Sequence, residues 1–498
     1  MSDYYGEGGR LAASAQDILI KSAYKHDCED ADILLPGLHK ADLAHAIMLI
    51  EQGIIPQESG AELIRGLLAL EAISVAEFPI DPAYGDVYNS KDVALKKEIG
   101  EVAGWLHIGR PRREAVNIGY LISVREGLLR LASAVARLAV IMIAKAGQNT
   151  ATIIPDFTYL HHAQPTSYGH YLMTFLYPLL RDQQRLMHAF DNINQSPAGS
   201  GSVNGSRLPL NRERLRELLG FAGIATHTRD AMWQIDTPIE AMGLLVSIMT
   251  NLSRMAEELQ IWNTAEFNMV DLSDSLCRAS VIMPQKKNPY PLAYVRGVAS
   301  SLLGKLPSFA AYGKIASGNP DSRIFIYGEL PRSLQKSIEA IDLMSAVIEG
   351  MEINGETTLQ RVKAGFSYAA DVAEFIVMEY RLDYRTAHNV VGAAVRSMIE
   401  MGLPGSDLTA EILDKAAMTV TGKTLNMDDK SLSELIKPES IVASRQTVGG
   451  AGNTQLKEML AECGAQSEQF SGWIARQEKS CGLAVLDAAA AALMESSE

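Results

Sequence analysis

Cysteine is scarce in this sequence, and its scarcity excludes two kinds of protein. Four cysteines are spread over 498 residues, at positions 28, 277, 463 and 481, and no pair has the spacing C-x-x-C. This pattern is unlike that of a disulfide-stapled secreted domain or a structural zinc site. We therefore expect a protein of a reducing compartment, the cytoplasm, that binds no metal.

The sequence also lacks long basic blocks and uninterrupted apolar runs. The formal net charge is −14 at pH 7, which argues against a general nucleic-acid-binding surface. The apolar run 131–146 is interrupted by Arg137 and Lys145, and a membrane-spanning helix needs about 20 consecutive, mostly apolar residues. The first residues, M-S-D-Y-Y-G-E-G, lack the basic-then-apolar order of a signal peptide. Neither nucleic acid nor a membrane is therefore expected as a partner.

Strand patterns are few and short, whereas helical periodicity is widespread. Stretches rich in Gly, Ser, Asn or Pro at 195–206, 277–288 and 316–326 are predicted to be loops. Asp42 precedes an apolar run and is predicted to cap a helix that begins there. The fold class is therefore mostly α. Apolar residues recur at helical spacing in segments 42–52, 61–76, 113–145, 169–190, 211–219, 237–267, 291–306, 330–349 and 369–380.

Chain length alone predicts two to four domains, and we expect a division into three. These are an N-terminal helical domain, 1–112, a central helical bundle, 113–365, that carries the loop 277–288, and a C-terminal helical domain, 366–498. The central helices are long and apolar on more than one face, so we expect the bundle to continue across a subunit interface.

The segment 280–289 reads S-V-I-M-P-Q-K-K-N-P and concentrates reactive side chains on a short run that contains two prolines. A β-elimination needs a base for a weakly acidic C–H proton, and cations and hydrogen-bond donors for the carbanion that follows. Ser280 could act as such a base only as its alkoxide, which the cation of Lys286 and nearby backbone N–H groups would stabilise. For an isolated Ser-Lys pair a solvated loop is the simpler interpretation, but the full string favours a catalytic loop.

This string resembles the signature S-x-x-M-P-x-K-x-N of the fumarase/aspartase superfamily, with Ser280, Met283, Lys286 and Asn288 in register. Further segments resemble the argininosuccinate lyase-like branch of that superfamily. They are L-H-I-G-R-P-R-R-E at 106–114, F-T-Y-L-H-H-A-Q-P at 157–165, P-A-G-S-G-S-V-N-G at 197–205 and V-A-S-R-Q-T-V-G-G at 442–450. The resemblance runs from about residue 30 to residue 475, which is nearly the whole chain.

The resemblance implies a three-domain lyase fold whose central long-helix bundle forms the core of a homotetramer, with each active site shared by three subunits. It implies a small anionic dicarboxylate as substrate, fumarate as product and no cofactor. Arg112 would clamp one substrate carboxylate, and Lys286 and Asn288 would hold the other, where negative charge develops. Weaker donors would come from Thr158, Thr166, Ser167 and Ser200.

Several positions depart from the branch. A histidine and a glutamate that pair in argininosuccinate lyases are replaced by Tyr159 and Ala293. Tyr290 stands where the branch has aspartate, Arg113 where it has asparagine, and Tyr88 where it has the histidine of E-D-V-H. We therefore expect retained fumarate chemistry with an altered amine pocket, for a leaving group bulkier, more apolar or more anionic than arginine. This would place the chain nearer to lyases for N-substituted aspartates, such as ethylenediamine-disuccinate lyase.

The general acid is left open. An amine can leave after protonation by bulk water, and Tyr159, His161 and His162 are the candidates if a dedicated acid exists. Two alternatives to an amine lyase also stay open. One is a cycloisomerase of the carboxymuconate type, or the elimination of a different leaving group, on the same fold. The other is a non-catalytic structural protein like the lens crystallins of this branch.

Overall fold

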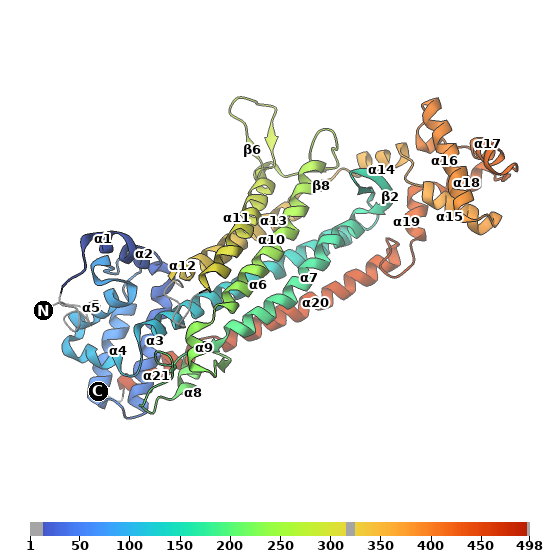
Figure 1. Ribbon diagram of the computed structural model, residues 1–498. Coiled ribbons are helices and arrows are strands. Elements are labelled where there is room, and N and C mark those ends of the chain that lie inside the picture. The colour runs from blue at the N-terminus through green and yellow to red at the C-terminus, as the bar shows by residue number, and fades with distance from the viewer. Residues whose placement is uncertain (1–12, 315–323, 496–498) are drawn as a thin grey trace.

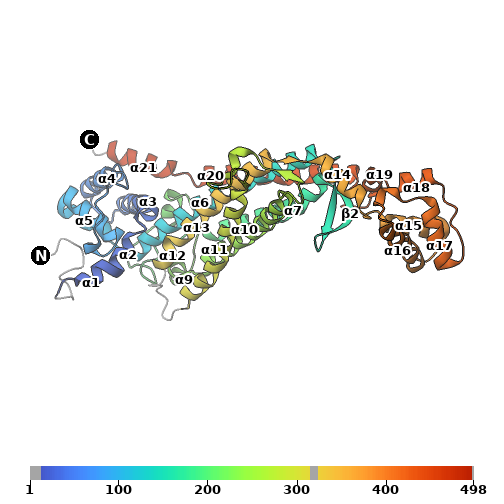
Figure 2. The same cartoon turned by 90° about the horizontal axis from the view of Figure 1, so that it is seen from above.

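The computed structural model describes residues 13–314 and 324–495 and shows an elongated molecule built almost entirely of helices (Figures 1 and 2). The predicted mostly α class is confirmed. A helical region near the N-terminus, a bundle of long helices and a separate C-terminal lobe follow one another along the long axis. The predicted loop 316–326 lies outside the described residues except for its end, which is helical and belongs to α12 (Ile324–Tyr327).

The N-terminal region packs around a buried helix, α3 (Ala31–Glu51). Asp42 lies in the middle of this helix and is buried, so the prediction that it caps a helix is wrong: its partners come from other parts of the fold. The other elements of the region are α1 (Asp17–Leu19), the π-helical turn Ile20–Tyr24, α2 (Lys25–Cys28), α4 (Gln57–Glu71), the 3₁₀ turn Pro82–Tyr84, α5 (Val87–Ile99) and the 3₁₀ segment Gly100–His107.

The bundle is organised by α6 (Arg112–Gln148), which begins directly after Pro111 and runs for 37 residues, about 55 Å at 1.5 Å per residue. α7 (Tyr168–Ile193), α13 (Glu329–Gly350) and α20 (Asn453–Ser480) pack against it. α10 (Asp236–Trp262) packs against α7 and α13, and α11 (Tyr290–Tyr312) packs against α10 and α13. Where α3 crosses α6, a Cβ atom on Gly37 would lie 2.5 Å from the Gly119 carbonyl oxygen. Only glycine permits the two helices to approach so closely.

Short strands and helices connect the long ones. The strand pairs are β1 (Ile153–Thr158) with β2 (His161–Ser167), β3 (Gln195–Ser196) with β4 (Gly223–Ile224), β5 (Val270–Asp271) with β8 (Glu352–Ile353), and β6 (Arg278–Ala279) with β7 (Lys287–Asn288); only the β3–β4 pair is parallel. The short connecting helices are α8 (Arg212–Leu218), α9 (Thr228–Trp233) and the 3₁₀ turn Asp274–Leu276.

The C-terminal lobe has an apolar core of its own, whereas one continuous core joins the N-terminal region to the bundle. After the lobe the chain returns along the bundle as α20 and ends as α21 (Ala484–Glu495), packed against α3 (Figure 1). The described part of the segment 366–498, residues 366–495, is thus divided in space between the lobe and the bundle. The remaining helices are α14 (Gly355–Ala364), α15 (Ala369–Tyr380), α16 (Tyr384–Met401), the 3₁₀ turn Gly405–Asp407, α17 (Ala410–Thr421), α18 (Asp429–Leu435) and α19 (Pro438–Ser444).

Two helices, Ala31–Glu51 and Arg112–Gln148, are long and apolar enough to cross a membrane. Their most apolar windows are 78% and 61% buried within the protein. Burial of this extent is typical of core helices, and α3 has that role in the N-terminal region and α6 in the bundle.

Candidate active site

A buried ion cluster anchors the segment 107–113, which we call the cationic segment. Asp42 forms ion pairs with both Lys91 and Arg110, and all three side chains are at most 2% exposed. Arg110 also donates to the Ala41 carbonyl at 3.0 Å. Burial alone would raise the pKa of Asp42, but Lys91 and Arg110 outweigh that effect and hold the pKa well below its usual range. The cluster fixes the start of α6 and leaves an excess of positive charge beneath it.

A second buried carboxylate fastens the glycine loop, residues 197–205, to the start of α6. Glu114 is fully buried and accepts the backbone N–H groups of Gly199 and Gly201 at 2.7 and 2.6 Å. Both glycines have φ near +70° (+76° and +64°), a conformation that other residues rarely adopt. Burial raises the pKa of Glu114 to about 7, against the lowering effect of these two N–H groups and of Arg110.

Removal of this carboxylate should release the loop. In Glu114→Ala the two buried N–H groups lose their acceptor, so we expect the free energy of unfolding to fall by about 2 kcal/mol or more. Amide hydrogen exchange in 197–205 should accelerate more than exchange in the rest of the bundle. Glu213→Ala is the control, because Glu213 is exposed and, among the described residues, forms an ion pair only with its helix neighbour Arg216. Unchanged exchange in the loop of Glu114→Ala would contradict this role for Glu114.

The cationic segment and the glycine loop together enclose a cavity of about 620 Å³. Arg112 lines it and lies 3.1 Å from the carboxylate of Asp86, so its guanidinium is partly neutralised within the chain. Ser200 is buried, and its hydroxyl accepts a hydrogen bond from Arg212 at 3.2 Å, which gives it a structural use in the loop. The lining residues are Tyr88, Asn89, His107, Gly109, Arg110, Pro111, Arg112, Gly201, Ser202, Gly205 and Ser206.

Arg113 lies elsewhere. It lines a separate, much smaller hollow with Asp27, Asp30 and Asp86. Burial and Asp86 raise the pKa of Asp27, and Arg113 opposes the rise. The second cation that the sequence offers at the start of α6 is thus directed toward carboxylates of the same chain.

The β1–β2 hairpin presents Thr158, Tyr159 and His161 at its exposed tip. Tyr159 and Leu160 form a two-residue turn with φ of +54° and +60°, the geometry of a type I′ turn, which usually contains asparagine or glycine. Tyr159 is 99% exposed, so its ring projects away from its own chain.

The two other hydroxyls predicted for this segment are buried at the base of the hairpin. The Thr166 hydroxyl lies 3.1 Å from His170 Nδ1, and the Ser167 hydroxyl caps α7 by accepting the His170 N–H at 3.1 Å. Within one chain, therefore, Thr166 and Ser167 have local structural partners and are not presented to solvent.

The signature loop, residues 280–288, extends from the β6–β7 pair. Ser280 accepts the backbone N–H of Met283 at 3.2 Å, and the side chain of Asn288 donates to the Arg278 carbonyl at 2.8 Å. Met283 and Lys286 are exposed. These contacts hold the two ends of the loop and leave its centre open to solvent.

The two lysines of this loop differ in their surroundings. Lys287 pairs with Asp274 at 2.8 Å and with Asp271 at 3.0 Å. The hydrogen bond that Lys287 donates to Asp274 is the main cause that raises the Lys287 pKa. Lys286 forms no ion pair with any residue that the structure describes. Lys286 is therefore the lysine available to a substrate. Tyr290 follows the loop, half exposed, with the Arg278 guanidinium 5.2 Å from its ring centre.

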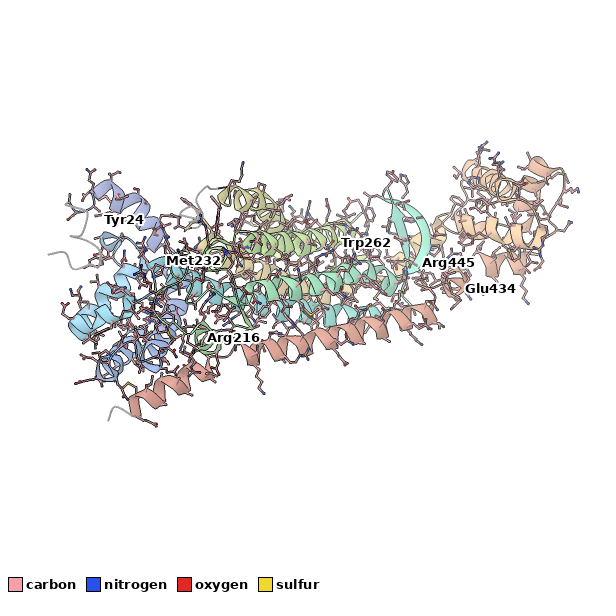
Figure 3. All side chains as sticks on the ribbon, turned by 60° about the horizontal axis from the view of Figure 1, so that its bottom comes forward. Tyr24, Arg216, Met232, Trp262, Glu434 and Arg445 are labelled. Atoms are coloured by element: carbon pink, nitrogen blue, oxygen red, sulfur yellow. The ribbon has the colours of Figure 1, made fainter. Side chains whose placement is uncertain are left out.

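A single chain does not bring these groups together. The residues that line the cavity belong to α5, the cationic segment at the start of α6 and the loop before α8. In Figure 1 the loop before α8 lies at the α8–α9 end of the bundle, the signature loop lies beyond β6, and the hairpin lies near α14. Figure 3 shows the same separation, with Met232 and Arg216 toward one end of the bundle and Trp262 and Arg445 toward the other. The predicted site residues thus form three groups on one molecule.

Comparisons with known proteins agree with this architecture. The family described as "Lyase" matches residues 23–304, and "Argininosuccinate lyase C-terminal" matches residues 366–443. The chain is 33% identical over 464 residues to an argininosuccinate lyase of Methanosarcina acetivorans, covering 91% of each protein. It is 26% identical to EDDS lyase in complex with formate, with a TM-score of 0.87 over 98% of this chain and 97% of that one.

A 3-carboxy-cis,cis-muconate lactonizing enzyme from Pseudomonas putida, 18% identical, has a TM-score of 0.72 over 88% of this chain and 95% of that one, which shows the shared fold alone. The helical fold and these matches define a lyase of the fumarase/aspartase superfamily. Within it, the chain belongs to the argininosuccinate lyase-like branch and is a carbon–nitrogen lyase.

Proposed function

We propose that this protein catalyses the reversible β-elimination of an amine from an N-substituted aspartate, with fumarate as the second product. At the level of the family, elimination of an amine to give fumarate is supported by the argininosuccinate lyase relatives. An EDDS lyase variant with bound fumarate is 26% identical to this chain, with a TM-score of 0.88 over 98% of it and 97% of that chain. A small anionic dicarboxylate fits both the cationic segment and the exposed Lys286.

One observation carries the proposal. The chain holds a preformed, glycine-lined cavity beside Arg112, and it presents Ser280 and Lys286 on a loop open to solvent far from that cavity. The exposure of these reactive side chains is explained if the loop closes over the cavity of a second copy of the chain. We therefore include in the proposal a homotetramer in which three subunits contribute to each site, with Tyr159 at the hairpin tip as the third contribution.

In the proposed reaction Ser280 removes the proton from the carbon next to one carboxylate. The C–H electron pair is first held as a carbanion, with its charge spread onto that carboxylate. It then forms the carbon–carbon double bond as the carbon–nitrogen bond breaks, and the nitrogen keeps the electron pair of that bond. Lys286 and Asn288 would hold the carboxylate on which charge builds before the bond breaks, where charge-assisted donors have the largest effect. Arg112 would hold the other carboxylate through its fork of donors.

The leaving group is proposed to differ from arginine. Tyr159 and Tyr290 replace charged or titratable residues of the branch with aromatic surface, which favours a bulkier or more apolar amine. Arg113 supports an anionic amine less well, because the structure directs it toward Asp27 and Asp86. Aminopolycarboxylates and N-alkyl aspartates are therefore the substrates to try beside argininosuccinate.

The experiment is incubation of the purified protein with fumarate and a panel of amines, amino acids and diamines. We expect loss of fumarate absorbance and a product mass equal to fumarate plus one amine. If no amine reacts while argininosuccinate and ethylenediamine disuccinate also stay intact, fumarate is not the product. A cycloisomerase, with which the chain shares its fold, would then be the better account.

A further inference from the structure

Three side chains form a hydrogen-bonded line that ends in the cavity. The Tyr88 hydroxyl lies 3.3 Å from His107 Nδ1, and His107 Nε2 lies 2.8 Å from an oxygen of Asp92. Tyr88 and Asp92 are four residues apart on α5 and thus share one helix face. Tyr88 is 4% exposed, the imidazole is 12% exposed, and both line the cavity next to Arg112 and Gly201.

The arrangement fixes how the imidazole is used. Because the Asp92 carboxylate accepts from Nε2, a neutral His107 has an unprotonated Nδ1, which accepts the Tyr88 hydroxyl proton. When His107 is protonated, Nδ1 carries a hydrogen and donates to the Tyr88 oxygen instead. The phenolic hydrogen is then free to turn into the cavity and meet a bound molecule.

The Tyr88 hydroxyl keeps its proton, and so can donate a hydrogen bond, at neutral pH. Burial raises the pKa of its phenol; among the charged neighbours Arg110 opposes this rise, while Asp42 and Asp92 add to it. The phenol is therefore protonated at neutral pH. A buried phenol kept neutral at the wall of a substrate cavity, with a histidine behind it, has the parts needed for transfer of a proton.

We propose that Tyr88 is the catalytic residue that protonates the departing amine, and that His107, held by Asp92, resupplies its proton. The inference rests on the proposed function. It gives that reaction a general acid, which Tyr159 and Ala293, standing where the branch has a paired histidine and glutamate, cannot form as a pair. As the carbon–nitrogen bond breaks, the nitrogen keeps the electron pair and takes the hydroxyl proton of Tyr88. The Nδ1 proton of His107 passes to the phenolate oxygen, and the neutral imidazole regains a proton from solvent.

The test compares release of the amine with removal of the C–H proton. Argininosuccinate and ethylenediamine disuccinate are incubated in D₂O with the wild-type protein and with Tyr88→Phe, which keeps the ring and loses only the hydroxyl. Fumarate release and deuterium entry into unreacted substrate are followed by NMR. We expect Tyr88→Phe to release fumarate at least about 100-fold more slowly than the wild type. Deuterium entry should persist, because Ser280 is intact.

His107→Gln should give the same separation, since glutamine is polar but cannot carry the proton. Tyr84→Phe is the control, because Tyr84 lies just before α5 and does not line the cavity. Release and deuterium entry that fall in parallel in Tyr88→Phe, or that both stay at the wild-type rate, would overturn the role of Tyr88. Absence of fumarate from the wild-type protein itself is a different result, which overturns the proposed function and the relay with it.

Discussion

Ser280→Ala is expected to lower kcat by at least about 100-fold, the smallest factor usual for loss of a general base. The loop should survive the change, because the Ser280 hydroxyl accepts only the Met283 N–H, at 3.2 Å, among the hydrogen bonds that the structure gives it. The circular dichroism spectrum and the oligomeric state should therefore be those of the wild type, while fumarate release from the best substrate is lost.

Ser275→Ala supplies the matched control. Ser275 is an exposed serine just before the same loop, and its hydroxyl contacts only that of Ser273, at 2.8 Å, in the described structure. Activity in Ser275→Ala should equal that of the wild type. An undiminished rate in Ser280→Ala would remove Ser280 as the base and leave the proposed chemistry without a group to take the proton.

Asp42→Ala is expected to cost about 3–5 kcal/mol in the free energy of unfolding, because it leaves the buried cations of Lys91 and Arg110 without their counter-charge. The measurement is urea unfolding followed by circular dichroism near neutral pH. The pKa of Asp42 is held below its ordinary value of 3.8, so its contribution to stability is complete above that pH and is lost only as the pH falls below it.

Asp342→Ala tests the same chemistry at the surface. Asp342 pairs with Arg137 at 2.7 Å, but both side chains are about half exposed, and such pairs contribute about 1 kcal/mol or less. A loss in Asp42→Ala no larger than that in Asp342→Ala would show that the buried cluster does not anchor the cationic segment.

The sequence predicts secondary structure better than it predicts which distant residues contact one another. Helical periodicity predicts α6, α7 and α13 within a few residues, because each buries apolar side chains at regular spacing. It places the start of α3 at Asp42 although the helix begins at Ala31, and it does not include α16 or α20. The local pattern predicts Asp42 as a cap, because a lone aspartate before an apolar run has the same pattern whether it caps a helix or lies inside one. Its two cationic partners, Lys91 and Arg110, are 49 and 68 residues away in the sequence.

In the candidate site, too, some residues are predicted from the sequence and others depend on contacts that only the structure shows. Side-chain chemistry at short spacing predicts Ser280 and Lys286 as site residues, and the family resemblance adds Arg112. Tyr88 is visible in the sequence only as a departure from the branch, and His107 and Glu114 only as members of the motif 106–114. Their roles, and the part of Asp92, depend on contacts between separate segments. Periodicity and spacing also could not reveal that Thr166 and Ser167 are buried, or that the site groups lie apart on one chain.

The central claim is that amine elimination occurs where the cationic segment of one subunit meets the signature loop of another. Ser280→Ala and Arg112→Ala should each be inactive alone. When the two variants are unfolded, mixed and refolded together, some sites receive an intact Ser280 from one chain and an intact Arg112 from the other. The account predicts that fumarate release returns in the mixture; mixed oligomers that form and stay as inactive as either variant would contradict it.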